Sequence, residues 1–153
     1  MSRTSNQHTR KTPQNLHPLQ PIYKKAHITL IMSSTRKVFI IGGTGAQGLP
    51  IIEALARDGA YSVRILTRDT SSRRAQSLLS TYPGRVELVP GTFTSESDVR
   101  AGMAGCWGAF VNIDGFAVGE ALEIFYTMRC YELAIQTGVK MYVHGNIDFG
   151  CKR

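Results

Sequence analysis

The sequence predicts an α/β protein with a doubly wound parallel sheet of about five strands in the order 3-2-1-4-5. Three observations lead to this fold class. Strand-like and helical segments alternate from Lys37 onward, three glycines follow the first strand at a regular spacing, and single glycines end the helical segments. Strands that alternate with helices form βαβ units, whose right-handed crossovers produce a parallel sheet.

Five short segments rich in apolar and β-branched residues are the expected strands. They are residues 37–41, 61–67, 86–90, 108–112 and 139–145. The expected helices are residues 46–59, 71–82, 95–105 and 120–138. A glycine, which ends a helix well at positive φ, stands at or just after the end of each helical segment. These glycines are Gly59, Gly84, Gly105 and Gly138. Thr94 or Ser95 is placed to cap the third helix.

The stretch VFIIGGTGAQG, residues 38–48, joins the first strand to the first helix. Gly42 allows a tight turn after the strand, Gly45 lets a pyrophosphate approach the backbone, and Gly48 lets the helix pack against the strand. The free N–H groups and partial positive charge of the helix N-terminus then hold the phosphates. We therefore predict a dinucleotide site in this turn, and a glycine-rich turn without a ligand is the alternative. Thr44, Ala46 and Gln47 complete the loop and are predicted to contact the cofactor with the three glycines.

The end of the second strand indicates which dinucleotide is preferred. About 20 residues after the last glycine, an acid binds the ribose hydroxyls of NAD, whereas an Arg accepts the 2′-phosphate of NADP. Thr67 and Arg68 stand here, and Arg73 and Arg74 add positive charge close by. We favour NADP(H) over NAD(H), because several cationic donors in one loop suit a phosphate. The alternative makes Arg68 a solvated strand-end residue and Asp69 a helix cap.

The net charge of +7 belongs to the N-terminal segment rather than to the expected domain. Residues 1–37 contain 7 of the 18 basic residues and no acid, so that 11 bases face 11 acids in the remainder. A neutral domain has no basic face for nucleic-acid phosphates, and direct nucleic-acid binding is therefore not expected. Residues 1–35 are expected to form a disordered basic arm upstream of an NAD(P)-binding domain over residues 36–150.

The N-terminal segment and the thiols bear on where the protein resides. The basic, acid-free segment has the composition of a mitochondrial transit peptide but lacks a clear amphipathic helix, and Met32 begins a polar lead-in typical of a natural start. Cys106, Cys130 and Cys151 show no disulfide or metal-ligand spacing and are expected to be reduced thiols. No apolar run reaches the length of a membrane span. We expect a cytoplasmic or nuclear protein without a metal, and favour this over a mitochondrial one.

These residues resemble the NmrA-like family, atypical members of the short-chain dehydrogenase/reductase superfamily with a Rossmann fold, and its fungal members in particular. The resemblance covers Val38 to about Gly150 and rests on four segments. They are GGTGAQG, LTRD, VELVPGTFTSESDVRAGMAGCWGAFVNID and GVKMYVHGNID. The resemblance implies a domain that binds NADP(H), with Asn112 also at the cofactor. Relatives usually have Gly-Asp after the third strand for an adenine contact, whereas here Thr92 follows Gly91, which keeps a hydrogen-bonding group and loses the carboxylate.

Catalysis is not expected from these residues. The superfamily uses a Tyr-x-x-x-Lys pair in hydride transfer, and none of the 6 tyrosines is followed four places on by Lys. Asn146 stands where the superfamily has a serine, and it fits a ligand contact and a loop residue equally well. His144 is favoured as a hydrogen-bonded structural residue over an acid/base group, while Asp114 fits a turn and a place near the nicotinamide equally well.

The resemblance therefore predicts a non-catalytic, redox-sensing regulator of the NmrA type. Relatives continue past the fifth strand with further strands, so that residues 36–150 correspond to a nucleotide-binding half, incomplete at its C-terminus. Two alternatives follow from this correspondence: the N-terminal part of an NADPH-dependent oxidoreductase, and a truncated product without independent function.

The fifth strand is expected to lie at the edge of the sheet. Met141, Tyr142 and Val143 then form an apolar edge with unpaired backbone groups, protected only by the charge of Lys140. Such an edge is a template for pairing with another chain. We therefore expect self-association or a protein partner at this edge.

Overall fold

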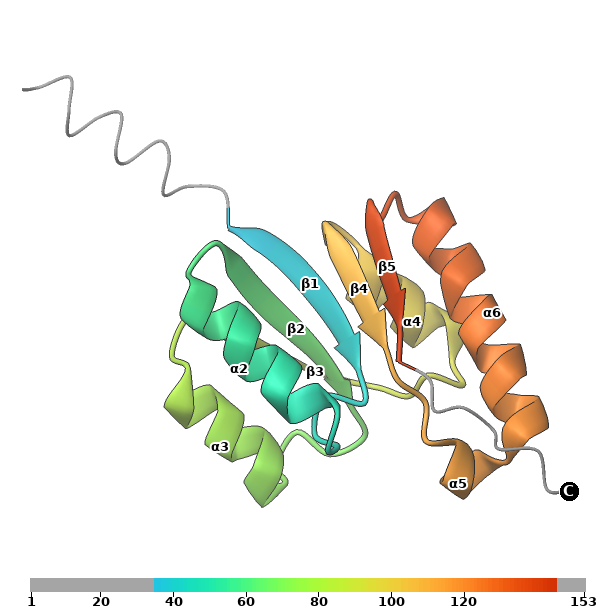
Figure 1. Cartoon of the computed structure of the whole chain (residues 1–153), viewed down its shortest axis with the longest axis horizontal. Coiled ribbons are helices and arrows are strands. Elements are labelled where there is room, and N and C mark those ends of the chain that lie inside the picture. The colour runs from blue at the N-terminus through green and yellow to red at the C-terminus, as the bar shows by residue number, and fades with distance from the viewer. Residues whose placement is uncertain (1–34, 146–153) are drawn as a thin grey trace, which may run out of the picture. The chain divides into compact units, whose positions relative to one another are not determined.

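A computed structural model describes residues 35–145 of the chain (Figure 1). Five strands alternate with helices. The strands are β1 (Arg36–Ile41), β2 (Tyr61–Thr67), β3 (Val86–Pro90), β4 (Gly108–Val111) and β5 (Met141–His144). The helices are α2 (Gly48–Asp58), α3 (Arg73–Thr81), α4 (Glu96–Met103), α5 (Gly115–Val118) and α6 (Glu120–Gln136). The expected disordered arm of residues 1–35 lies outside the described residues except for Thr35, as do residues 146–150 of the expected domain.

All five strands are parallel and lie in the order β3-β2-β1-β4-β5, which confirms the predicted doubly wound sheet. β1 is central, with Val38 opposite Val63 of β2 and Gly108 of β4. Every predicted strand and helix is present, with ends that differ by a few residues. The short helix α5 was not predicted, because the four residues GFAV are too few to show a helical period.

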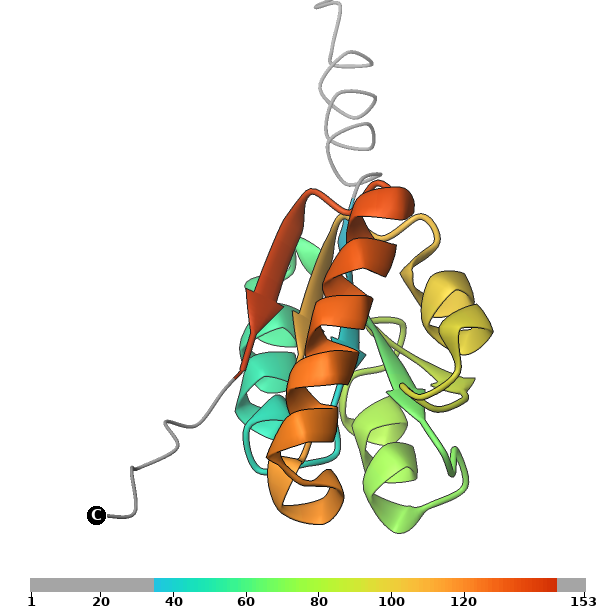
Figure 2. The same ribbon diagram turned by 90° about the vertical axis from the view of Figure 1, so that its right-hand side faces the viewer.

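The helices cover both faces of the sheet. Figures 1 and 2 show α2 and α3 on one face, with α4 and α6 on the other. Alternate residues of β1 point into the two cores, with Val38 and Ile40 in the core beneath α2 and α3, and Phe39 and Ile41 in the core beneath α4 and α6. A strand that is buried on both faces must be apolar throughout, which explains the run VFII.

The predicted helix ends are also present. All four glycines expected after helices have positive φ, for example 80° at Gly59, which is the C-cap of α2. Ser95, rather than Thr94, caps α4, because its hydroxyl accepts a hydrogen bond from the backbone N–H of Asp98. These local signals fix where the helices start and stop on the sheet.

A charged cluster joins the sheet to the C-terminal end of α4. The guanidinium of Arg64 on β2 donates to the backbone carbonyls of Gly102 and Ala104, both at 3.0 Å. Glu87 on β3 accepts from Lys37 Nζ at 2.8 Å and lies 3.2 Å from Arg64 Nε. Both cations lower the pKa of the Glu87 carboxyl, and the hydrogen bond from Lys37 has the larger effect. The cluster therefore links β1, β2 and β3 to one another, and Arg64 pairs with carbonyl groups at the C-terminal end of α4 that lack partners within the helix.

Gly102 lets α4 pack closely against β1. A Cβ on this residue would lie 2.2 Å from Cε2 of Phe39, a ring that is fully buried. Gly102→Ala should therefore lower the free energy of unfolding by about 1–3 kcal/mol, measured by urea denaturation. The control Ala101→Ser, at an exposed position of the same helix, should change it by less than about 0.5 kcal/mol. Equal stability of the two variants would contradict this packing.

Candidate dinucleotide site

The predicted site lies where the strands β1 to β4 end, on one side of the sheet. Its centre is the turn between β1 and α2. Gly42 has a φ of 79°, and a Cβ here would lie 2.3 Å from the carbonyl oxygen of Asn112. The turn closes with a hydrogen bond of 3.0 Å from the Gly45 N–H to the Gly42 carbonyl. Gly42 is therefore required both for the direction of the turn and for its contact with the end of β4.

Gly48 lets the first turn of α2 come close to the glycine-rich turn. A Cβ on Gly48 would lie 2.3 Å from the Gly42 carbonyl oxygen and 2.5 Å from Gly43 Cα. Gly43 is itself restricted, since its Cβ would lie 2.7 Å from the Ile65 side chain on β2. The prediction did not include Gly43, although the doubled glycine at positions 42 and 43 is a visible signal for it. Gly45, by contrast, borders open space except for the Gly42 carbonyl, at 3.2 Å.

The N-terminus of α2 is suited to an anion. Gln47, the N-cap residue, makes no side-chain hydrogen bond to the helix, and the first turn contains no acidic residue. The free N–H groups are therefore not occupied by a carboxylate or a capping hydroxyl of the described chain. Thr44 and Gln47 are half-buried in the loop and Ala46 is exposed. Close backbone approach and free N–H groups together form a phosphate cradle.

The segment after β2 is held by short polar contacts. The Thr67 hydroxyl accepts from the Asp69 N–H at 3.3 Å, and the Asp69 carboxylate accepts from the Ser71 hydroxyl at 2.6 Å and N–H at 2.8 Å. The hydrogen bonds from Ser71 lower the pKa of the Asp69 carboxyl. Asp69 thus orders the turn, and the cap of α3 is Ser72, whose hydroxyl accepts from the Ala75 N–H. The alternative of Asp69 as the helix cap is therefore wrong.

Arg74 is the basic residue of this segment that contacts the glycine-rich turn. Its Nη1 lies 3.5 Å from the Thr44 carbonyl oxygen. Arg68 is exposed at the end of β2, and Arg73 is exposed on the first turn of α3. The sequence grouped Arg73 and Arg74 together, and the helical phase of α3 separates them, because consecutive residues of a helix point about 100° apart.

The loop after β3 is fixed by an acid that the sequence analysis did not select. The Asp98 carboxylate on α4 accepts from the Thr92 N–H at 3.0 Å. Gly91 has a φ of 152°, and a Cβ there would lie 2.8 Å from the Asp98 carboxylate. The Thr92 hydroxyl accepts from the Thr94 N–H at 3.3 Å and shares a hydrogen bond of 3.0 Å with the Thr94 hydroxyl, which leaves capacity for one more partner. The signal for Asp98 was its place in the first turn of α4, three residues after the capping serine.

Asn112 lies between the glycine-rich turn and the end of β5. Its N–H donates to the Ile41 carbonyl at 3.2 Å, which continues the β1–β4 ladder past the strand ends. A Cβ on Gly145 would lie 3.0 Å from Oε1 of Gln47 and 3.3 Å from Asn112 Cβ. Gln47, Asn112 and Gly145 therefore meet at the edge of the candidate site.

The other polar candidates have structural roles in the described residues. His144 Nε2 lies 3.2 Å from the Thr127 hydroxyl, as expected of a structural histidine. Asp114 is the N-cap of α5 and accepts from the Phe116 N–H at 3.2 Å. Of the two roles that the sequence left open for Asp114, this contact corresponds to the turn residue. Asn146 lies outside the described residues.

The two described cysteines are buried free thiols. Burial raises the pKa of Cys106, and raises that of Cys130 to about 12. A thiol with a raised pKa is a poor nucleophile and a poor metal ligand at neutral pH. Within residues 35–145, no three His, Cys, Asp or Glu side chains are grouped so that they can hold a metal ion. No helix in the same range is long and apolar enough to cross a membrane.

The fold and the turn at its centre define a Rossmann-type domain with the glycine cradle of dinucleotide-binding proteins. A model of the NmrA-like family matches residues 34–148. The chain belongs to the NmrA-like family.

Two curated relatives are NmrA-like family domain-containing oxidoreductases from fungi. Hkm9 of Aspergillus hancockii is 32% identical over 115 residues, which cover 72% of this chain and 33% of the relative. MalD of Malbranchea aurantiaca is 37% identical over 79 residues, which cover 50% of this chain and 23% of the relative. The chain therefore spans a third or less of the length of these relatives.

Solved structures of the negative transcriptional regulator Nmra have the same fold. The complexes of that protein with NAD and with NADP both match with a TM-score of 0.65 and 20% identity, over 76% of this chain and 35% of theirs. At this identity the likeness concerns the fold, which agrees with the predicted strand order.

Two glycine substitutions separate packing from ligand approach. Gly48→Ala should lower the free energy of unfolding by about 3 kcal/mol, because its Cβ overlaps the backbone of the turn. Gly45→Ala should change stability by less than about 1 kcal/mol and still weaken dinucleotide binding at least tenfold, because its methyl group blocks the phosphate approach. Urea unfolding and fluorescence titration measure the two effects. Unchanged binding by a folded Gly45→Ala variant would contradict the placement of the phosphates.

Proposed function

We propose that the domain binds NADP(H) in the turn between β1 and α2 and acts as a non-catalytic, redox-sensing regulator of the NmrA type. The observation that carries the proposal is the contact between Arg74 and the Thr44 carbonyl, at 3.5 Å. It brings a permanently charged guanidinium to the rim of a turn that is otherwise built from backbone N–H groups and glycines. Structures of Nmra with NAD and with NADP support dinucleotide binding in this family.

The charges around the site favour a cofactor with an additional phosphate. Arg68, Arg73 and Arg74 are exposed at one end of the sheet, and Asp69 is the acid among them. Ser71 orients the Asp69 carboxylate through Oδ1, and Arg68, not Asp69, stands at the position that carries the acid in an NAD-specific site. A guanidinium pairs well with a phosphate because its planar donors match two phosphate oxygens.

Two features of the residues support a binding role over catalysis. None of the tyrosines has a Lys four residues on. Tyr142, which lies on the strand at the end of the site, donates its hydroxyl to the Thr127 carbonyl at 3.1 Å. Burial, with a smaller contribution from Cys130, raises the pKa of Tyr142, so its hydroxyl does not serve as an acid/base group near neutral pH.

The second candidate function is the nucleotide-binding part of an NADPH-dependent oxidoreductase. The curated fungal relatives are named as oxidoreductases, and this chain covers 33% of the length of Hkm9. In that case the substrate region and the acid/base residues belong to the part of the relatives that this chain does not match.

Cofactor preference is the direct test of the basic residues. NADPH should bind roughly ten- to a hundredfold more tightly than NADH, because a charge-assisted hydrogen bond to phosphate contributes about 1.5–3 kcal/mol. Arg74→Ala and Arg68→Ala should each reduce this ratio, measured by calorimetry. The matched control is Arg57→Ala, which removes an exposed guanidinium paired with Glu53 on α2 and should leave the ratio unchanged. Equal affinities of the parent protein for the two nucleotides would exclude the NADP assignment.

Turnover distinguishes the two candidate functions. The purified 153-residue protein should bind NADPH without consuming it when small aldehydes and ketones are supplied. Absorbance of the reduced nicotinamide measures this directly. Steady NADPH oxidation that depends on the carbonyl compound and disappears in the folded Gly45→Ala variant would replace the regulatory proposal with the reductase one.

A further inference from the structure

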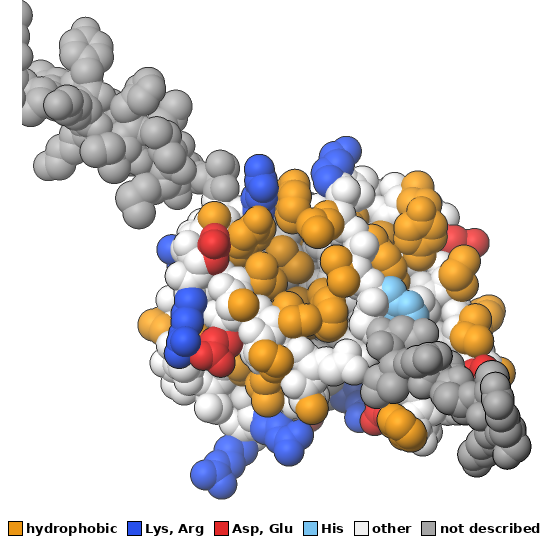
Figure 3. Space-filling view, viewed as in Figure 1, with side chains coloured by type: hydrophobic (Ala, Val, Ile, Leu, Met, Phe, Trp, Pro, Cys, Tyr) orange, Lys and Arg blue, Asp and Glu red, His pale blue; other side chains and the backbone are white. Residues whose placement is uncertain are grey.

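The side of the molecule beyond β5 is apolar on both faces of the sheet. On the α2 face, an open groove of about 290 Å³ runs between α2 and β5, and its lining includes Leu55, Trp107, Phe110, Met141 and Val143. Figure 3 shows hydrophobic side chains gathered in this region. Met141 is 50% exposed and Val143 is 42% exposed, so the last strand presents apolar side chains to solvent.

On the opposite face, α6 presents a continuous apolar stripe. The stripe consists of Ile124, Met128, Tyr131 and Ile135, which are between 45% and 61% exposed. Their spacing of four, three and four residues places them on one side of the helix. Arg129 on a different side of α6 pairs with Glu96 of α4, so the stripe is turned away from α4. Tyr131 packs edge-on against Tyr142 of β5, with ring centroids 5.4 Å apart, which places the stripe beside the β5 edge.

The two sheet edges differ in their protection. The β3 edge carries Glu87 and ends in Pro90, and a charge and a proline both discourage pairing. β5, the sequence Met141–His144, contains no Lys, Arg, Asp, Glu or Pro. No described strand pairs with its outer edge, because β5 is the last strand of the sheet. Within residues 35–145, the N–H and C=O groups on this edge therefore have no strand partner.

We propose that two copies of this chain pair through their β5 edges, antiparallel about a two-fold axis beside Tyr142, with the two α6 stripes in contact. A two-fold axis perpendicular to the sheet keeps both α6 helices on one face and joins the two grooves on the other. When Tyr142 faces its counterpart, Met141 lies opposite Val143 of the second copy, and all four of these side chains point into the joined groove. This agreement between strand register and side-chain direction is what a self-complementary edge requires.

The exposed area is of the size that a dimer needs. Six apolar side chains take part, namely the four of the stripe with Met141 and Val143, each roughly half exposed. With about 150–250 Å² for a large side chain, they offer on the order of 600 Å² per copy before the strand backbone is counted. A standard interface buries about 800 Å² per partner. A two-fold interface also closes on itself, so it gives a dimer rather than a filament.

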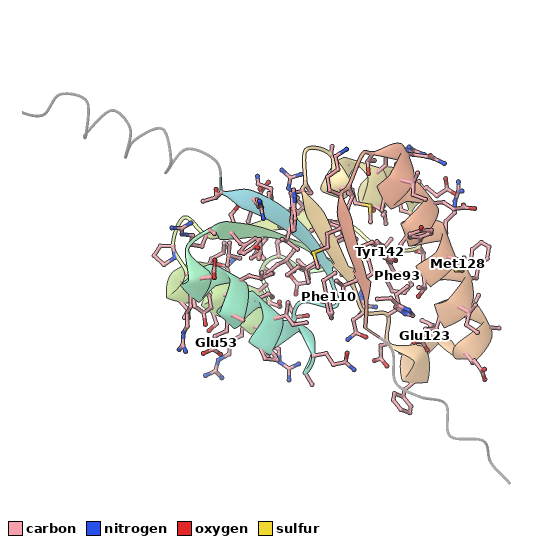
Figure 4. All side chains as sticks on the ribbon, turned by 45° about the horizontal axis from the view of Figure 1, so that its top comes forward. Glu53, Phe93, Phe110, Glu123, Met128 and Tyr142 are labelled. Atoms are coloured by element: carbon pink, nitrogen blue, oxygen red, sulfur yellow. The ribbon has the colours of Figure 1, made fainter. Side chains whose placement is uncertain are left out.

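Figure 4 labels Met128 on the side of α6 that faces away from Phe93, and this residue is the best point at which to test the interface. Tyr142 contacts α6 at Thr127 and Tyr131, so an axis beside Tyr142 brings the two copies of Met128 near each other. Met128→Glu should therefore give a monomer. Leu122→Glu is the matched control, because Leu122 is an apolar residue of the same helix, 49% exposed and outside the stripe.

The experiment measures the mass of the full 153-residue chain by light scattering after chromatography, at two concentrations tenfold apart. The parent chain and Leu122→Glu should have twice the mass of one chain, and Met128→Glu the mass of one, with far-ultraviolet circular dichroism unchanged. If Met128→Glu is unfolded, Ile135→Lys replaces it, since Ile135 is the most exposed member of the stripe at 61%.

A mixture of charge variants tests the homotypic contact. Met128→Glu and Met128→Lys should each be monomeric alone and form a dimer when mixed, because opposite charges then meet across the axis. A monomeric parent at both concentrations would overturn the proposal. So would a dimeric Met128→Glu variant, a mixture that stays monomeric, or a mass that keeps growing with concentration. Nucleotide binding by a monomeric variant would leave the proposed function intact, so the two proposals fail separately.

Discussion

The backbone contact between Gly48 and the Gly42 carbonyl is the constraint on which the rest of this structure depends. A side chain at position 48 would overlap the turn, with a Cβ only 2.3 Å from that oxygen. Without a side chain, α2 starts directly after the glycine-rich turn and its first N–H groups point to the proposed phosphate position. The same contact sets the distance of α2 from the sheet, so that Ile52 is fully buried against β1 and β2. One glycine thus serves both the core and the site.

The site is assembled from loops that are far apart in sequence because the sheet is parallel. All strands end on the same side, so the segments after β1, β2, β3 and β4 converge there without any long connection. The central position of β1 places its turn next to both β2 and β4. The order β3-β2-β1-β4-β5 therefore brings Arg74, which follows β2, and Asn112, which follows β4, to opposite sides of one glycine-rich turn.

The fold could be predicted from the sequence because each signal was local. The run VFII indicates a strand buried on both faces, and glycines mark the helix ends with positive φ. Parts of the site were not predictable because they depend on contacts between distant residues. Asp98 binds the Thr92 N–H from a helix that starts four residues later, and its place three residues after the capping serine indicates the start of the helix but not this contact. The choice of Arg74 over Arg73 depends on the helical phase of α3, which the sequence fixes only to within a residue or two.

Trp107 gives the molecule a natural optical probe at the end of the sheet opposite the glycine-rich turn. It is the single tryptophan of the chain, and it lies just before β4, where the strands begin. Tyr61 packs against it with ring centroids 6.0 Å apart, and the Arg36 guanidinium lies 4.7 Å from its ring centre. Its indole is half-buried and borders the apolar groove. The wavelength of its fluorescence emission therefore depends on the polarity at that end of the sheet. Tryptophan fluorescence of the unlabelled chain therefore reports on this one region of the molecule.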